Sequence, residues 1–349
     1  MLAPPPLPRK LDAAIRDLAS SRPATRASAI SDLVRHALLH DEVRARALPL
    51  IEGALKNDEA PEVRSAAAVA LGDLGAACAL PTLLVAIEDA NVHVRQLAIN
   101  ALGEVGDSRA LPRLSRALGD ARPEVRYQAI IAFARVASDE GDVGVALARA
   151  CGDADDAVRY IALRIAEERI DRDPVRPVPA PTAVLSEARA RVATDAPHVA
   201  LAAAILLAKV GEEPLDGARK VILGVVRGGR SAAAAPEKED EREAVELAGA
   251  LDLRDAVPDL ERRAWGLGSM VRDTCAWHAK IALARMGHPR AEKEILRDLE
   301  SPRPETRAAA VVASGRARLV SAREKVAALA RAEGLDPQLV TDALARLGQ

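Results

Sequence analysis

Histidine is the side chain in this sequence with the clearest capacity to bind a metal. Of the six histidines, His36 and His40 lie four residues apart on a predicted helix, with Asp41 adjacent, and this spacing could hold a metal ion. Surface or capping histidines are the simpler interpretation. His278 follows Cys275 by three residues, which we interpret as core packing on a helix. We therefore predict no metal site.

The three cysteines, Cys78, Cys151 and Cys275, lie far apart in the sequence. Their spacing gives neither a disulfide framework nor a CxxC metal motif, so we expect free, buried thiols in a reducing cytoplasm. The phosphate-binding pattern GxxxxGK followed by Ser or Thr is absent, and the glycine pair at 228–229 precedes Arg-Ser instead. Zinc-protease and EF-hand patterns are missing as well. We predict no catalytic residue and no cofactor.

Charge and aromatic content argue against nucleic acid as a partner. The chain of 349 residues has 51 acidic and 49 basic side chains, a formal net charge of −2, so it lacks the global positive surface that binds nucleic acid without sequence preference. Aromatic residues make up only 1% of the chain, which leaves few rings for base stacking. Arginine far outnumbers lysine in an alanine-rich composition, which favours a bacterial origin.

An internal repeat of about 31 residues runs through the first half of the chain. Arg64, Arg95 and Arg126 are each 31 residues apart, Arg159 follows after 33, and each comes directly after a valine. An Ala-Leu-Pro unit recurs at residues 47–49, 79–81 and 110–112, before Arg64 and between the next arginines, and an Ala-Val-Pro unit follows later at 256–258. Two markers that share one period indicate a repeat architecture.

Both units of the repeat have the pattern of short α-helices. In the first unit the apolar residues lie on one helical face, namely Val63, Ala67, Ala70, Leu71 and Leu74. In the second, Pro81 fits the first turn, where its missing N–H has no helical partner. A helix pair this short cannot bury its apolar stripe alone, so successive pairs must stack into a solenoid.

This pattern resembles the HEAT-repeat family, in particular the short bacterial repeats similar to those of phycobilisome lyases. The resemblance is strongest over residues 41–170 and recurs more loosely over 242–349. It implies an all-α, right-handed α-α superhelix, a HEAT-type solenoid of about nine helix pairs. We expect a capping helix over 9–20 and a last helix over 336–347. Pairs are expected to start near residues 23, 61, 92, 123, 155, 196, 237, 268 and 303.

An acid lies six residues before each repeat arginine. The pairs are Asp58 and Arg64, Asp89 and Arg95, Asp120 and Arg126, and Asp153 and Arg159. In HEAT proteins such pairs form a ladder between neighbouring repeats, and the resemblance implies this structural role here. A guanidinium has five donors, so it can tie its own turn and also bridge to the adjacent repeat. At Arg307 the sixth residue back is Ser301, so that rung lacks its acid.

The chain divides by this reading into three segments. Residues 1–170 form an N-terminal HEAT arm, 171–240 an irregular helical segment with a Pro-rich linker and a loop, and 241–349 a C-terminal HEAT arm, together one continuous solenoid. The N-terminus lacks a secretory signal pattern. The longest apolar run, 199–208, is shorter than the roughly 20 residues that a membrane helix needs. We expect a cytoplasmic protein without a membrane partner.

The second helix of each pair, which follows the marker proline, is expected to line the concave side of the solenoid. Positions one and four after the proline should face outward. They include a small apolar strip at Leu50, Thr82 and Val85 beside a basic step at Arg113 and Arg116. Arginine anchors are common in interfaces. We therefore predict a non-enzymatic protein–protein interaction scaffold or adaptor that binds another protein or a peptide on this concave face.

Two other functions follow from the resemblance. One is a chromophore-lyase-like or enzyme-accessory subunit. The other is a HEAT-like DNA-binding protein similar to an alkylpurine glycosylase, for which Trp265 and Trp277 are the only indoles available. The iron-binding signature of HEAT hydroxylases is missing, because the sequence has no His-Glu dipeptide. The sequence leaves the identity of the partner and the oligomeric state open.

Overall fold

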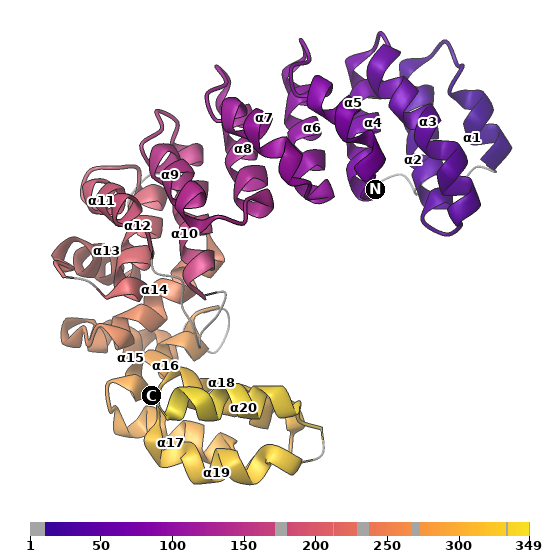
Figure 1. Cartoon of the computed structure of the whole chain (residues 1–349). Helices are drawn as coiled ribbons and strands as arrows, with labels where there is room; N and C mark the ends of the chain where they lie inside the picture. Colours follow the sequence, from indigo (N-terminus) through magenta and orange to yellow (C-terminus); the bar gives the residue numbers. More distant parts are fainter. Residues whose placement is uncertain are drawn as a thin grey trace. The chain divides into compact units, whose positions relative to one another are not determined.

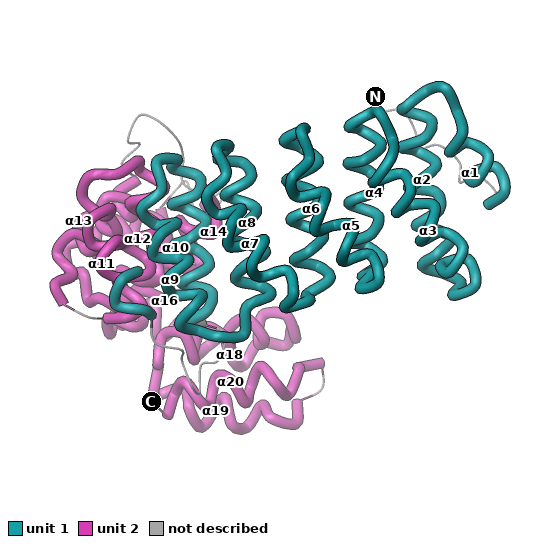
Figure 2. The backbone as a smooth tube through the Cα atoms, turned by 45° about the horizontal axis from the view of Figure 1, so that its top comes forward, with its two compact units in different colours: residues 1–184 teal, residues 185–349 magenta. Residues whose placement is uncertain are grey.

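The computed structural model describes residues 11–171, 180–211, 213–228, 237–266, 273–332 and 334–348. Within these residues the regular structure consists of 20 α-helices and five short 3-10 helices, without a strand. The chain forms two compact units, residues 1–184 and residues 185–349 (Figure 2). The predicted linker at 171–181 and loop at 228–240 fall largely outside the described residues.

Unit 1 is a stack of antiparallel helices (Figure 1). They are α1 (Leu11–Asp17), α2 (Pro23–Ala37), α3 (Asp41–Asn57), α4 (Pro61–Asp73), α5 (Leu80–Ala86), α6 (Val92–Val105), α7 (Leu111–Ala117), α8 (Pro123–Val136), α9 (Glu140–Cys151) and α10 (Asp156–Asp171). Single 3-10 turns, Ala77–Ala79 and Ser108–Ala110, lead into α5 and α7. The next helix, α11 (Thr182–Arg191), runs across the boundary between the units.

Unit 2 continues the same alternation. Its helices are α12 (Pro197–Val210), α13 (Asp216–Val226), α14 (Lys238–Ala250), α15 (Val257–Trp265), α16 (Ala276–Arg285), α17 (Pro289–Asp298), α18 (Pro304–Arg316), α19 (Arg323–Ala328) and α20 (Pro337–Leu347). The 3-10 turns are Arg254–Ala256, Val320–Ala322 and Leu329–Arg331.

The predicted all-α fold is confirmed, and the chain order gives nine helix pairs between α1 and α20 in the described residues. Most predicted starts lie within a residue or two of the observed ones. The exception is α16, which begins at Ala276 rather than near 268. Residues 267–272, which include Arg272, lie outside the described residues.

Packing in space shifts this pairing by one helix. Most odd-numbered helices pack closely on the even-numbered helix that follows them, as α3 does on α4, α5 on α6 and α15 on α16. By contrast, α4 and α5 contact each other little although they are consecutive. From α3 to α8 the compact hairpin therefore consists of an Ala-Leu-Pro helix followed by a Val-Arg helix, so the Val-Arg helix is the second member of these pairs.

Small residues allow the even-numbered helices to approach closely. A Cβ on Gly72 of α4 would lie 3.0 Å from the Cα of Ala101 in α6, and a Cβ on Gly103 of α6 would lie 3.1 Å from the Cβ of Ala132 in α8. The odd-numbered helices α3 and α5 share few contacts. Because a stack bends toward the row whose neighbours are closer, the even-numbered helices lie on the inner side of unit 1 (Figure 1).

The apolar residues that identified the repeat form the core between the two rows. Val63, Ala67, Ala70 and Leu71 of α4 are almost completely buried, as are Leu80 and Leu83 of the neighbouring α5. Burial of each aliphatic side chain contributes roughly 1.5–3 kcal/mol, an upper estimate because an unfolded chain is already partly compact. These contacts, repeated in every pair, hold the framework on which exposed residues are displayed.

Candidate protein-binding surface

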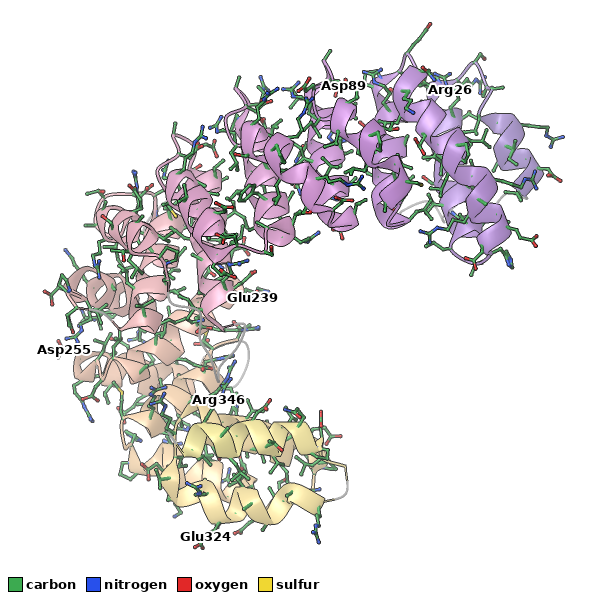
Figure 3. The ribbon with its side chains drawn as sticks, viewed as in Figure 1. Arg26, Asp89, Glu239, Asp255, Glu324 and Arg346 are labelled. Atoms are coloured by element: carbon green, nitrogen blue, oxygen red, sulfur yellow. The ribbon has the colours of Figure 1, made fainter. Side chains whose placement is uncertain are left out.

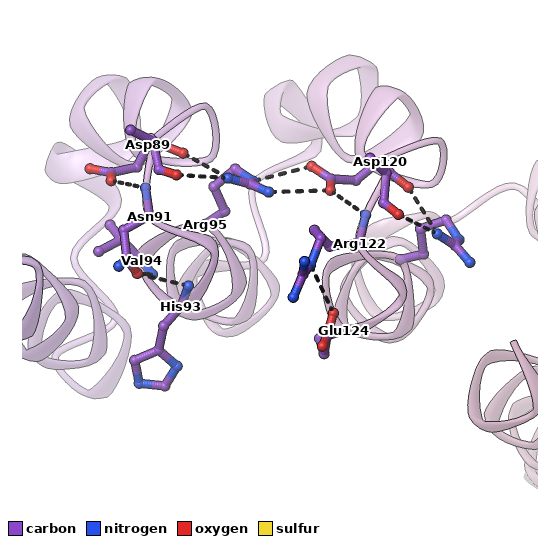
Figure 4. A network of polar contacts seen from close by, with 11 residues as sticks. Asp89, Asn91, His93, Val94, Arg95, Asp120, Arg122 and Glu124 are labelled. Atoms are coloured by element: carbon purple, nitrogen blue, oxygen red, sulfur yellow. Dashed lines mark hydrogen bonds and ion pairs between the residues drawn. The ribbon is translucent and has the colours of Figure 1, made fainter.

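A ladder of arginine and aspartate side chains fixes the spacing between repeats of unit 1. In Figure 4, Arg95 lies between Asp89 of its own repeat and Asp120 of the next. Its Nη1 donates to the backbone carbonyl of Asp89 at 2.9 Å, and its Nε donates to Asp120 Oδ2 at 3.1 Å. One guanidinium thus closes its own turn and binds the carboxylate of the following repeat.

The same geometry recurs on both sides of this rung. Arg64 donates from Nε and Nη2 to the carboxylate of Asp89 at 2.8 and 2.9 Å. Arg126 contacts Asp153 in the same way at 2.8 and 2.6 Å. Bidentate pairs of this kind are strong and directional, and these side chains are only 13–16% exposed. The ladder therefore sets the register of adjacent helix pairs.

Each ladder aspartate also caps its own turn. Asp89 Oδ1 accepts a hydrogen bond from the backbone N–H of Asn91 at 2.8 Å, and Asp58 and Asp153 do the same two residues ahead. Hydrogen bonds from Arg26 hold the pKa of Asp58 below its ordinary value. Burial opposes ionisation of Asp89 and Asp153, but hydrogen bonds from arginine and backbone outweigh it, so the pKa of each is lowered.

The ladder begins one repeat earlier than the sequence predicted. Arg26 donates to both carboxylate oxygens of Asp58 at 2.7 Å and to the carbonyl of Ser20 at 2.9 Å. In Figure 3, Arg26 and Asp89 lie along the same edge of unit 1. The signal was a proline three residues before the arginine, because Pro23 precedes Arg26 as Pro61 precedes Arg64. At the other end, Arg159 keeps the bond to the carbonyl of Asp153 at 2.8 Å.

Unit 2 shows what happens where the ladder lapses. Arg307 donates to the carbonyl of Ser301 at 2.9 Å, so its own turn needs no carboxylate. An acid at position 301 would serve an arginine on the preceding even helix, but Ala276 occupies the corresponding place on α16. The ladder arginine on α16 and the ladder acid at position 301 are thus both missing at this interface between repeats.

Four positions on each Val-Arg helix point away from the odd-numbered helices. Counted from the repeat arginine they are two before it and two, five and nine after it, which share one side of an α-helix. All sixteen are exposed or partly exposed in α4, α6, α8 and α10. We call them the even-helix face: Glu62, Ala66, Val69 and Asp73; His93, Leu97, Asn100 and Glu104; Glu124, Gln128, Ile131 and Arg135; Ala157, Ile161, Arg164 and Glu168.

The centre of the even-helix face is aliphatic and almost uncharged. It consists of the positions two and five after each arginine, where Leu97, Ile131 and Ile161 are partly exposed. Gln128 Nε2 donates to Asn100 Oδ1 at 2.9 Å, so these two amides bridge α8 and α6 across the centre. Such partly exposed aliphatic side chains beside polar ones are typical of the core of a protein interface.

The edges of the face carry excess negative charge. At positions two before and nine after the arginine there are five acids, namely Glu62, Asp73, Glu104, Glu124 and Glu168. The one basic residue there, Arg135, makes an ion pair with Glu104. Arg164, in the centre, makes an ion pair with Glu167. The face as a whole therefore favours a partner with an apolar middle and basic flanks.

The residues predicted from the marker proline lie on the opposite, odd-numbered row. Leu50 of α3 and Val85 of α5 are exposed, at 38% and 73%. Thr82, predicted to face outward, is buried at 3%, because its Oγ1 donates to Glu52 of the preceding repeat at 2.7 Å. The expectation that these helices line the inner side is wrong, since the pairing is shifted by one helix.

The predicted basic step on α7 is partly neutralised. Arg113 and Arg116 both contact Glu88, Arg113 at close range and Arg116 at 3.5 Å. The side chains of all three are more than 40% exposed, so these ion pairs are weak. The group carries one net positive charge rather than two.

The histidines and cysteines do not assemble a metal site in the part of the chain that the structure describes. Cys78 is exposed, contrary to the expectation of burial, whereas Cys151 and Cys275 are buried, and neither forms a disulfide in the described residues. Burial, followed by the charge of Glu241, raises the pKa of the Cys275 thiol to about 11. Among the described helices none combines the length and the apolar character needed to cross a lipid bilayer.

The repeat geometry now agrees with a comparison of the sequence with protein families. A model described as HEAT repeats matches residues 47–134 and again residues 80–164. Residues 47–164 carry HEAT repeats. The matched HEAT region spans the four predicted Asp-Arg pairs and most of the even-helix face. No curated protein matches the sequence at a significant level.

Several solved structures are similar to this chain at low sequence identity. An engineered protein is 17% identical, with 97% of this chain and 99% of that chain covered and a TM-score of 0.47. The complex of CpcE and CpcF of phycocyanin lyase from Nostoc sp. PCC7120 is 18% identical, with 75% and 96% covered and a TM-score of 0.43. A mutant of Kap121p is 14% identical, with 97% and 40% covered and a TM-score of 0.49. Likenesses this distant carry no argument about function.

Proposed function

We propose that this chain is a non-enzymatic HEAT scaffold that binds another protein through the even-helix face of unit 1. The observation that supports it is the aliphatic centre of that face, where Leu97, Ile131 and Ile161 remain partly exposed on three successive repeats. The bacterial cytoplasm expected from the sequence is part of this proposal.

The chemistry of the face indicates the kind of partner. The partner would bury its own apolar side chains against the centre and place basic side chains near the acidic edges. Removal of aliphatic surface from water supplies affinity, at roughly 25 cal/mol per Å² before the costs of association. Complementary charge at the rim contributes mainly to the association rate and to specificity.

The rigid framework favours binding without rearrangement. Bidentate Arg-Asp pairs lock the spacing between α4, α6 and α8 along one edge, and the close approach of Gly72 to Ala101 locks it along the helices. A preformed surface loses little conformational entropy on binding. This supports a scaffold that presents a fixed pattern of side chains to its partner.

The test compares two surfaces of the same full-length protein. Leu97→Arg and Ile131→Arg place positive charge in the centre of the even-helix face, and Val85→Arg places it on the odd-numbered row, where the side chain is 73% exposed. Each variant is used as bait in a bacterial lysate, and bound proteins are quantified by mass spectrometry. We expect specific partners to be depleted at least tenfold by Leu97→Arg and Ile131→Arg and retained by Val85→Arg.

The opposite pattern would assign binding to the odd-numbered row, together with Leu50, Arg113 and Arg116. Equal retention by all three variants would refute a role for either surface. Circular dichroism confirms that the variants are folded. A chromophore-lyase-like activity is tested in parallel, because a bilin mixed with such a protein would change its absorbance, and that change would contradict the scaffold proposal.

A further inference from the structure

The last turns of three even-numbered helices of unit 2 carry arginines where unit 1 carries mostly acids. At the position nine after the repeat arginine, unit 1 has Asp73, Glu104, Arg135 and Glu168. The equivalent residues of α16, α18 and α20 are Arg285, Arg316 and Arg346, at the last turns of the three helices. Arg318 follows two residues after Arg316. Arg346 is labelled in Figure 3.

Only one carboxylate serves this group in the described part of unit 2. Glu246 of α14 accepts from Arg316 Nη1 at 2.8 Å, and the same oxygen lies 2.6 Å from His278 Nδ1. Arg285, Arg318 and Arg346 have no carboxylate within ion-pair distance among the residues that the structure describes there. The arginines therefore exceed the acid by three positive charges.

Arg285 is the most constrained of the group. It is partly buried, and its one hydrogen bond in the described residues runs from Nη1 to the carbonyl of Arg316 at 3.3 Å. In contrast, four ladder arginines each bind both oxygens of a carboxylate, namely Arg26, Arg64, Arg95 and Arg126. Burial and then the like charge of Arg318 lower the pKa of Arg285. A guanidinium that has lost water without gaining a carboxylate retains unused donors for an incoming anion.

Arg318 holds an unfavourable backbone conformation. Its φ is +50°, in the left-handed region, where the corresponding turn after α4, α6, α12 and α16 uses glycine. A non-glycine residue is disfavoured there, because its Cβ lies too close to the following carbonyl oxygen. Asp252, after α14, shares this conformation. At Arg318 this unfavourable backbone conformation adds a third guanidinium, besides those of Arg285 and Arg316, near enough to Arg285 for their like charges to interact.

We propose that Arg285, Arg316 and Arg318 form an anion-binding site for a carboxylate-rich segment of a protein partner. Arg285 Nη1 reaches the carbonyl of Arg316 from α16 to the end of α18, so the arginines of the two helices converge. An extended chain rises about 3.3 Å per residue, so carboxylates a few residues apart on it can reach these guanidinium groups together. Guanidinium groups bind carboxylates in a bidentate fork, as the ladder of this chain shows. The inference rests on the proposed function only in taking the partner to be a protein.

The experiment uses the full-length protein and a fluorescein-labelled peptide, Glu-Gly-Gly-Glu-Gly-Gly-Glu, with the Gln version as its control. Fluorescence anisotropy at low salt measures affinity. We expect the Glu peptide to bind at least tenfold more tightly than the Gln peptide, and Arg285→Gln and Arg318→Gly each to weaken binding at least fivefold. Arg318→Gly relieves the backbone cost, so it should also raise the unfolding midpoint. Loss of binding in a stabilised protein cannot come from misfolding.

A matched control removes the same charge elsewhere in unit 2. Arg297 is 70% exposed on α17 and pairs with Asp298, and Arg297→Gln should leave peptide affinity unchanged. Equal weakening by Arg297→Gln would show diffuse attraction and overturn the site. Arginine variants that alter stability but not binding would show that these residues only offset helix dipoles. Displacement of the peptide by equimolar inorganic phosphate or by an oligonucleotide would assign a phosphate ligand and reject the peptide.

Leu97→Arg in unit 1 separates this inference from the proposed function. It should leave Glu-peptide affinity unchanged, since Leu97 lies on another unit of the chain. Failure of either experiment then bears on one surface alone.

Discussion

Removal of a ladder carboxylate should destabilise unit 1 far more than removal of its exposed neighbour. Asp89 and Glu88 are consecutive, so Asp89→Asn and Glu88→Gln delete the same charge at nearly the same place. Asp89 accepts two hydrogen bonds from Arg64 and one from the N–H of Asn91. Glu88 contacts Arg113 and Arg116 in solvent.

The magnitudes follow from burial. Asp89 and Arg64 are 14% and 16% exposed, so Asp89→Asn leaves a mostly buried guanidinium without its carboxylate. Hydrogen bonds to charged groups contribute about 1.5–3 kcal/mol each, and breaking a fully buried pair costs about 3–5 kcal/mol. We expect a loss of about 3 kcal/mol for Asp89→Asn. Exposed pairs contribute roughly 0–1 kcal/mol, which is the loss expected for Glu88→Gln.

Urea unfolding and thermal unfolding, each followed by circular dichroism at 222 nm, measure both variants. In a unit of this size 1 kcal/mol lowers the thermal midpoint by roughly 2–4 °C, so Asp89→Asn should lower it by about 6–12 °C. Amide hydrogen exchange should increase first in α4 and α6, which the rung joins. The double variant Asp89→Asn with Arg64→Met should lose at least about 1 kcal/mol less stability than the sum of the losses of the two single variants. A loss for Asp89→Asn no larger than that for Glu88→Gln would refute the ladder argument.

Two further predictions concern close packing and pH. A Cβ at Gly249 would lie 2.6 Å from the Cα of Ala282, so Gly249→Ala should destabilise unit 2 by roughly 1–3 kcal/mol. Gly53 is in an open helical position, so Gly53→Ala should stabilise the protein by roughly 0.5–1 kcal/mol. Urea midpoints of the two variants test this, and equal midpoints would contradict the packing. The pKa of Asp89 is lowered in the folded protein, so its stabilising effect is complete above its unfolded pKa, near 4, and is lost as pH falls through the folded pKa. Urea midpoints from pH 7 to pH 2.5 should therefore fall more steeply in the wild type than in Asp89→Asn. Parallel curves for the two proteins would contradict this.

The helices and the ladder could be predicted because their signals are local. A proline at the first turn and a 3.6-residue apolar pattern fixed the start of α4 at Pro61 and that of α8 at Pro123. The 31-residue period placed Asp58 and Asp89 at equivalent positions of successive repeats, and it did the same for Arg64 and Arg95. The start of α16 at Ala276 differs from the expected start near 268, because no proline marks its first turn.

The binding face could not be predicted in the same way. An apolar stripe shows which side of a helix is buried, but not which of two rows approaches its neighbours more closely. That depends on backbone contacts such as Gly72 against Ala101, which form only when the repeats stack. Thr82 was misplaced for a related reason, because its hydroxyl is satisfied by Glu52 of another repeat. Both properties are set by contacts between repeats.

The ladder also bears on how a chain of this kind can change in length. Each repeat contributes one carboxylate and one guanidinium, and each guanidinium takes its backbone carbonyl from six residues earlier. Excision of residues 90–120 would place Asp89 six residues before Arg126, which already reaches Asp153, while Arg64 would keep Asp89. Every donor would still have its acceptor, so gene duplication or deletion in whole periods can lengthen or shorten unit 1 without orphaning a charge.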